Sequence, residues 1–120
     1  MRSLFLSLLL SAVFVLPAGA AVDTSKLQLP GDITLEQART VVEGALEFAK
    51  KQGVPMNITV VDAGGNLKAF CRMDGAFLGS IDISQKKAVT ARRFNMSSAE
   101  LGALAQPGKE LFGIEATNGG

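Results

Sequence analysis

The sequence contains no histidine, tyrosine or tryptophan among its 120 residues. Without imidazole or phenol groups, the chain cannot build a histidine-based zinc site, a Ser-His or Cys-His nucleophile pair, or a haem site with a His or Tyr ligand. Its single cysteine excludes an internal disulfide framework and a four-cysteine metal cluster. We therefore expect no zinc, and no nucleophile–base pair is visible.

The charges are balanced. Lys and Arg number 12 and Asp and Glu number 11, which gives a net charge of +1. Such a chain offers no basic surface to a phosphate backbone, so we expect no nucleic-acid binding. With 48% hydrophobic and 19% charged residues, the composition is that of a folded chain, and the length allows one domain.

Residues 1–20 are typical of an export signal. Arg2 supplies a positive start, residues 4–16 carry no charge, and Ala18 and Ala20 provide the small residues of a cleavage site. The apolar run is too short for a membrane span of ~20 residues, so we expect no span after cleavage. The mature protein is predicted to be periplasmic or secreted.

The segment after the leader predicts a flexible tether over residues 21–33, because it is polar and has no periodicity. A domain over residues 34–120 follows. Thr34 and Gln37 form a capping box at the start of an amphipathic helix of about 16 residues. Gly53 and Pro55 are its expected stop signals.

Residues 56–73 predict a β-hairpin with its turn at residues 63–66. The first strand has apolar residues on both faces, which is typical of a strand inside a sheet. In the returning strand, alternation predicts that Leu67, Ala69, Cys71 and Met73 face one way and that Lys68, Phe70 and Arg72 face the other.

Two further helices are expected. Ser80 is the predicted N-cap of a helix over residues 81–93, whose inward side is predicted to carry Ile83, Lys87 or Ala88, and Ala91. Ser97 and Glu100 form a second capping box and open a shorter helix that ends at Ala105. The fold class is therefore α/β, of the α+β type.

Several groups of residues have both a structural and a functional interpretation. The loop at residues 62–66 resembles a cation or phosphate loop, but it lacks the lysine and the following helix of a P-loop, which favours a hairpin turn. The carboxylates could form a metal site or act as caps and solvated charges: Asp74, Asp82 and Glu115. The basic side chains could bind an anion or form a solvated helix face: Arg72, Lys86, Lys87, Arg92 and Arg93.

We predict a ligand site where the end of the hairpin meets the second helix. The candidate residues are Arg72, Asp74, Asp82, Lys87 and Thr90. In this hypothesis Arg72 or Lys87 pairs with an anionic group of the ligand, and such a charge-assisted bond contributes roughly 1.5–3 kcal/mol. The weaker metal-ligand candidates are Met73, Cys71 and Met96, although methionines are more often core residues and Cys71 is expected to be a small buried side chain.

A series of motifs over residues 33–120 resembles the GlcG/HbpS-like family. The series reads VVDAGGNL at residues 60–67, RMDGA at 72–76, SIDI at 80–83, and KA followed by TA at 87–91. The resemblance implies a profilin-like three-layer sandwich, in which helices flank a five-stranded antiparallel sheet. It also implies a small-molecule ligand, with haem as a possible cofactor, and a homo-oligomer.

The family pattern continues beyond Gly120. Members of the family usually have further strands after Asn118-Gly119-Gly120, so the resemblance implies that late strands are missing and that the chain is a fragment. A strand over residues 56–61 would then keep an unpaired edge, which invites association. We accordingly expect the chain not to be a stable monomer.

Three classes of function remain open at this point. The first is an exported protein that binds haem or a related tetrapyrrole, which the resemblance favours. The second is an enzyme that acts on haem or on a small organic acid, as a glycolate-utilisation relative would. The third is a protein without catalysis, either a binder of a small organic acid or an oligomeric sensor accessory.

The leader generates the first testable prediction. We expect exported protein to begin at Ala21, because Ala18 and Ala20 occupy the small-residue positions of the cleavage site. Mass spectrometry of the exported material measures its first residue, and material that still begins at Met1 would contradict cleavage.

Overall fold

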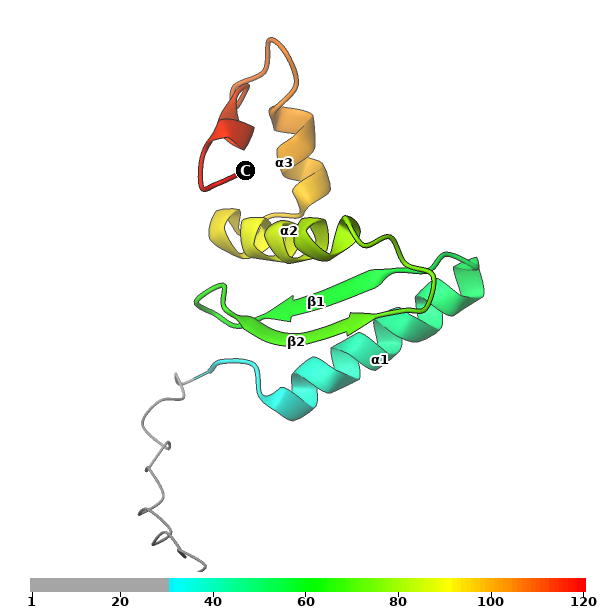
Figure 1. Cartoon of the computed structure of the whole chain (residues 1–120). Coiled ribbons are helices and arrows are strands. Elements are labelled where there is room, and N and C mark those ends of the chain that lie inside the picture. The colour runs from blue at the N-terminus through cyan, green and yellow to red at the C-terminus, as the bar shows by residue number, and fades with distance from the viewer. Residues whose placement is uncertain (1–30) are drawn as a thin grey trace, which may run out of the picture.

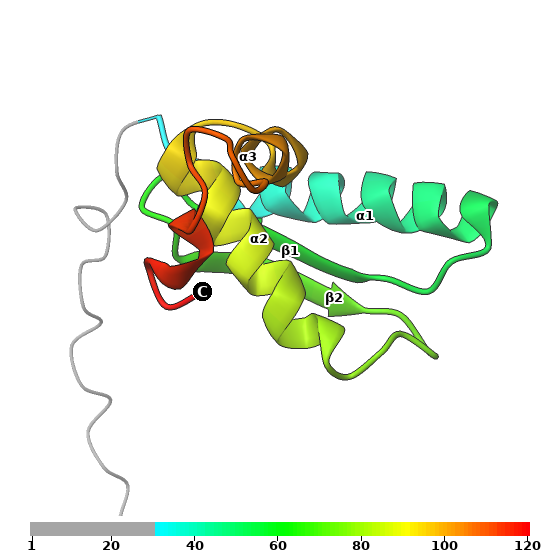
Figure 2. The same cartoon turned by 90° about the horizontal axis from the view of Figure 1, so that it is seen from above.

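The computed structural model describes residues 31–120, and the predicted leader and most of the predicted tether lie outside these residues. Its elements, in chain order, are α1 (Leu35–Gln52), β1 (Asn57–Val61), β2 (Leu67–Arg72), α2 (Ser80–Phe94), α3 (Ser98–Leu104) and the short 3₁₀ helix η2 (Ile114–Ala116). The two strands lie between α1 and α2, and α3 lies on the far side of α2 (Figures 1 and 2). The predicted α/β fold class, with helices flanking an antiparallel sheet, is confirmed.

Helix α1 begins and ends where local sequence signals place its ends. The Thr34 hydroxyl accepts a hydrogen bond from the Gln37 N–H at 3.1 Å, and the Gln37 side chain accepts one from the Thr34 N–H at 2.9 Å. At the other end Gly53 adopts a left-handed conformation, with φ of 68°, which lacks a steric penalty only for glycine. The predicted capping box and stop are both confirmed.

The hairpin turn is organised by the Asp62 carboxylate. One of its oxygens accepts hydrogen bonds from the N–H groups of Gly64 at 2.9 Å and Asn66 at 2.8 Å. These bonds, first of all the one from the Asn66 backbone, hold the pKa of Asp62 below its usual range. The loop is therefore a hairpin turn, as expected, and the Asp62 carboxylate is engaged by hydrogen bonds within that turn.

The strand register separates the two faces of the sheet. β1 pairs with β2 antiparallel, with Thr59 opposite Phe70 and Val60 opposite Ala69, and an irregularity follows Val60. Because opposite residues point to the same face, Thr59 and Phe70 share one face and Val60 and Ala69 share the other. In the described residues the sheet has these two strands.

Helix α2 is attached to the hairpin at three places. The Thr59 and Ser84 hydroxyls share a hydrogen bond of 2.9 Å. Near the start of the helix, the buried Asn57 side-chain amide donates to the Phe77 carbonyl at 2.9 Å. Near its end, Arg92 Nε donates to the Ala63 carbonyl at 2.7 Å. These bonds hold α2 against the hairpin just before its start, within it and near its end.

Two expectations for this helix are wrong. Ser80 is not the N-cap: Gly79 holds that position without a side-chain cap, and the Ser80 N–H instead donates to the Phe77 carbonyl at 3.1 Å. Ile83 does not point inward, because it is 55% exposed. Contact with β1 is made through the neighbouring Ser84, so the helix is rotated relative to the expected inward face.

Asp32 lies in the part of the predicted tether that the structure describes. Its carboxylate accepts a hydrogen bond from the Ala63 N–H at 2.8 Å, so this position contacts the hairpin turn.

Cys71 is only half-buried, in contrast to the buried side chain that the alternation predicts. Among the helices of residues 31–120, none is long and apolar enough to cross a membrane.

Candidate functional site

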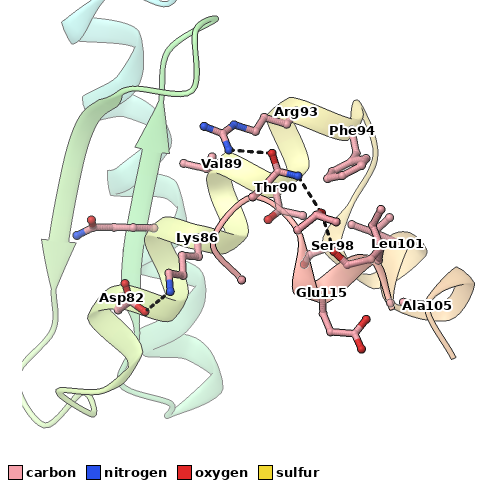
Figure 3. Close-up of a pocket in the computed structure, with 16 residues that line it drawn as sticks. Asp82, Lys86, Val89, Thr90, Arg93, Phe94, Ser98, Leu101, Ala105 and Glu115 are labelled. Atoms are coloured by element: carbon pink, nitrogen blue, oxygen red, sulfur yellow. Dashed lines mark hydrogen bonds and ion pairs between the residues drawn. The ribbon is translucent and has the colours of Figure 1, made fainter. Parts of the chain in front are cut away.

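A cavity of about 440 Å³ lies between α2, α3 and the C-terminal segment (Figure 3). This volume is within the range of small-molecule sites, which are roughly 300–1,000 Å³. Its lining residues are Asp82, Gln85, Lys86, Val89, Thr90, Arg93, Phe94, Ser98, Leu101, Gly102, Ala105, Ile114, Glu115, Thr117, Asn118 and Gly120.

Helix α2 provides the charged wall. Lys86, Thr90 and Arg93 follow one another at spacings of four and three residues, which places them on one face of the helix. Lys86 Nζ lies 3.2 Å from an Asp82 carboxylate oxygen, and both side chains are largely exposed. Such an exposed pair contributes little to stability and leaves the ammonium group accessible.

Arg93 lies at the other end of the same wall. Its Nη1 donates to the Asn118 side-chain oxygen at 3.2 Å, which is a bond to a neutral amide. Within residues 31–120, no carboxylate lies within ion-pair distance of this guanidinium group. Arg93 is thus a cation whose present partner is weaker than a carboxylate would be.

Helix α3 and the chain that follows it provide the apolar side. Leu101 is 7% exposed, and half-buried Ala105 and Ile114 line the cavity beside it. The Leu111 N–H donates to the Leu104 carbonyl at 3.1 Å, which turns the C-terminal segment back toward α2. Phe94 and Val89 of α2 complete the apolar lining.

The short helix α3 depends on its predicted capping box. The Ser97 hydroxyl accepts a hydrogen bond from the Glu100 N–H at 3.2 Å, and the Glu100 carboxylate accepts one from the Ser97 N–H at 2.8 Å. The Ser97 side chain, and after it the Ser97 backbone, hold the pKa of Glu100 below its usual range.

The structure brings together only part of the predicted ligand site. Asp82 and Thr90 line the cavity, whereas Arg72, Asp74 and Lys87 are exposed and do not. Of the basic residues noted in the sequence, Lys86 and Arg93 line it instead. The helical spacing of residues 86, 90 and 93 was a usable signal for this wall. No polar motif in the sequence indicated that α3 and the C-terminal segment would also line the cavity.

The candidate metal ligands lie elsewhere. The Met73 sulfur accepts a hydrogen bond from the Met56 N–H at 3.3 Å, at the open end of the hairpin. Cys71 is on β2 opposite Ile58, and neither it nor Met96 lines the cavity. In the described part of the chain, no three His, Cys, Asp or Glu side chains are grouped so that they could hold a metal ion.

A second, more open groove of about 300 Å³ lies between α1 and β2. Its lining residues are Leu35, Arg39, Val42, Glu43, Lys68, Ala69 and Phe70. It contains fewer polar side chains than the first cavity and none of the predicted site residues.

The hairpin, the flanking helices and the lateral cavity define a small α/β domain with a ligand-sized site. The family described as haem degrading protein HbpS-like matches residues 33–120, and the chain belongs to this family. The resemblance noted in the sequence is confirmed.

Similar proteins include a 15.0 kDa protein encoded between dhaT and dhaS in Citrobacter freundii, which is 38% identical over 94 residues. That match covers 78% of this chain and 66% of the relative, so the chain spans about two thirds of the relative's length. The corrinoid adenosyltransferase PduO of Citrobacter freundii is 33% identical over 98 residues, which cover 81% of this chain and 29% of that enzyme.

Two solved structures are similar. The protein ORFY of Klebsiella pneumoniae superposes with a TM-score of 0.72 at 34% identity, covering 83% of this chain and 68% of that one. A complex of PduOC with haem superposes with a TM-score of 0.67 at 32% identity, covering 70% of this chain and 61% of that one. These likenesses support the assigned fold class.

The Glu100 cap generates a pH prediction for the wall of the cavity. Because the pKa of Glu100 is lowered by folding, the cap stabilises α3 above the unfolded-state pKa and is lost as the pH falls through the lowered value. We expect amide protection at Leu101, measured by NMR hydrogen exchange, to fall in acid beyond the intrinsic change in exchange rate.

In Glu100→Gln the acid response should flatten, because the amide oxygen still accepts the Ser97 N–H bond but does not titrate. Glu110→Gln is the matched control, since Glu110 is exposed and lies outside the cap, and it should behave as the parent protein does. An unchanged acid response in Glu100→Gln would assign it to another group.

Proposed function

We propose that this chain binds haem or a related tetrapyrrole in the cavity between α2 and α3. The observation that carries the proposal is the juxtaposition of an apolar wall, which includes Leu101 and Ile114, with two cations, Lys86 and Arg93. A tetrapyrrole of the haem type has the same division, with a large apolar ring and carboxylates on its edge. The membership of a haem-degrading family and the likeness to a haem-bound PduOC structure support this choice of ligand.

The residues fit the periphery of such a ligand. Lys86 and Arg93 supply charge-assisted hydrogen bonds to carboxylates, and the Thr90 hydroxyl between them can donate a further one. The half-buried side chains of Val89 and Phe94 offer apolar contact to the ring. Bound haem would supply the redox chemistry of its iron, while these residues hold and orient the ring.

A small organic acid is the second candidate. Arg93 bonds only a neutral amide in the described structure, and a small carboxylate such as glycolate would satisfy it. That ligand would leave the apolar wall unused, which is why the tetrapyrrole is preferred. A competition experiment, in which glycolate displaces bound haemin, measures the relative affinity of the site for the two ligands.

Export to the periplasm or the medium is a further part of the proposal. It rests on the charged start, the apolar run and the cleavage signal in residues 1–20. An exported protein of this kind would meet haem outside the cytoplasm.

Titration of the purified protein with haemin tests the binding proposal, with a Soret band that shifts and saturates as the expected result. Lys86→Gln and Arg93→Gln should each weaken binding by about tenfold, because a charge-assisted hydrogen bond contributes at least roughly 1.5 kcal/mol. The absence of a saturable shift in the parent protein would contradict haem binding.

Adjacent residues provide matched controls for these variants. Lys87→Gln and Arg92→Gln remove the same charge, but neither side chain lines the cavity, so haemin affinity should stay near that of the parent protein. Circular dichroism of Arg92→Gln checks that the fold is retained, since Arg92 also holds the hairpin turn. Equal weakening in Lys86→Gln and Lys87→Gln would move the site toward the residues first predicted from the sequence.

Self-association is also part of the proposal. Phe77 and Leu78 form an apolar projection that is 82% and 70% exposed, and a second copy of the chain would remove it from water. We expect sedimentation velocity to detect oligomers of the parent protein. In Phe77→Ser the fraction of monomer should be higher at the same protein concentration.

Phe112→Ser is the control for this measurement, because Phe112 is 63% exposed in a different part of the chain. A parent protein that sediments as a monomer at every concentration would contradict association.

A further inference from the structure

We propose that the cavity recognises its tetrapyrrole by the carboxylates and the apolar ring, and not by the central metal. This inference rests on the proposed function and makes it more specific. The ligand class becomes tetrapyrroles with two carboxylates on one edge, whether the ring holds iron, another metal or none.

The first argument concerns the atoms that line the cavity. Haem iron in proteins is held mainly by imidazole, thiolate, thioether or phenolate groups. The lining residues contain none of these, and the whole chain has no histidine or tyrosine. Its polar lining consists instead of hydroxyl, amide, carboxylate and cationic groups.

The sulfur atoms of the described residues are placed away from the cavity. The Met73 sulfur is engaged by the Met56 N–H at 3.3 Å. Cys71 shares its sheet face with Ile58, and Thr59, the neighbour of Ile58, bonds α2 from the opposite face. Met96 follows α2 but does not line the cavity. Within residues 31–120, no thioether or thiol lines the cavity.

The nitrogen and oxygen atoms of the cavity lining are either engaged by other residues or are poor ligands for haem iron. The Lys86 amine is already engaged, because its Nζ lies 3.2 Å from an Asp82 carboxylate oxygen. The carboxylates and hydroxyls of the lining are not among the groups that mainly hold haem iron in proteins. The lining thus offers little binding energy that depends on iron.

The cations are spaced for two carboxylates of one ligand. Lys86 and Arg93 are seven residues apart on α2, which is about two turns and roughly 10 Å along the helix axis. Both side chains line the same wall, and Thr90 lies between them (Figure 3). Two acids on one edge of a ring can then pair with the two cations while the ring lies against Leu101.

The decisive experiment compares three ligands on the same purified protein: haemin, iron-free protoporphyrin and the dimethyl ester of protoporphyrin. Porphyrin fluorescence reports the binding of the two iron-free ligands, and the shift of the Soret band reports the binding of haemin. We expect the iron-free acid to bind within about threefold of haemin, and the ester to bind at least about tenfold more weakly than the iron-free acid, which is about 1.4 kcal/mol.

The variants separate the contributions of the cations from those of sulfur. The preference for the acid over the ester should shrink in Lys86→Gln and in Arg93→Gln and persist in Lys87→Gln. Haemin affinity and the haemin absorption spectrum should be unchanged in Met73→Leu, Met96→Leu and Cys71→Ser. A spectral change in any of these three variants, with the fold retained, would contradict metal-independent binding.

The outcomes also separate this inference from the proposed function. Binding of haemin with at least tenfold weaker binding of the iron-free acid would overturn the inference and leave haem binding standing. Equal binding of ester and acid would remove the role assigned to the two cations. Failure of all three ligands to bind would overturn the proposed function itself.

Discussion

The hydrogen bond between the Thr59 and Ser84 hydroxyls joins the hairpin to the helix that carries the candidate site. It lies midway between the Asn57 bond near the start of α2 and the Arg92 bond near its end. Because an α-helix is stiff, attachment at three positions fixes both its place and its rotation about its own axis. The cavity wall is on the side of the helix that this rotation leaves free.

The capping boxes of α1 and α3 and the hairpin turn were predictable because their signals are local. Thr34 with Gln37 and Ser97 with Glu100 are three residues apart, and each pair forms the reciprocal bonds that the spacing indicated. The turn at Asp62 likewise depends on neighbours within four residues. Interactions of this range do not depend on how distant elements pack.

The errors arose where distant parts of the chain meet. Periodicity placed Ile83 inward, but the bond from Ser84 to a strand 25 residues earlier determines the rotation of α2. The cavity closes only because the C-terminal segment returns to α2, where Arg93 meets Asn118. No local pattern encodes that return, so the sequence pointed to individual cations but not to their shared wall. Family membership, in contrast, followed from motifs spread over residues 33–120.

The Phe77 carbonyl accepts two donors, the Asn57 side chain at 2.9 Å and the Ser80 backbone at 3.1 Å. One acceptor therefore joins the beginning of a strand to the first turn of a helix. A displacement of that strand end would therefore also displace the start of the helix, because both hydrogen bonds weaken when they lengthen. Asp82 lies two residues beyond Ser80 and lines the cavity. The two bonds to the Phe77 carbonyl therefore link the acidic end of the cavity wall to the start of β1.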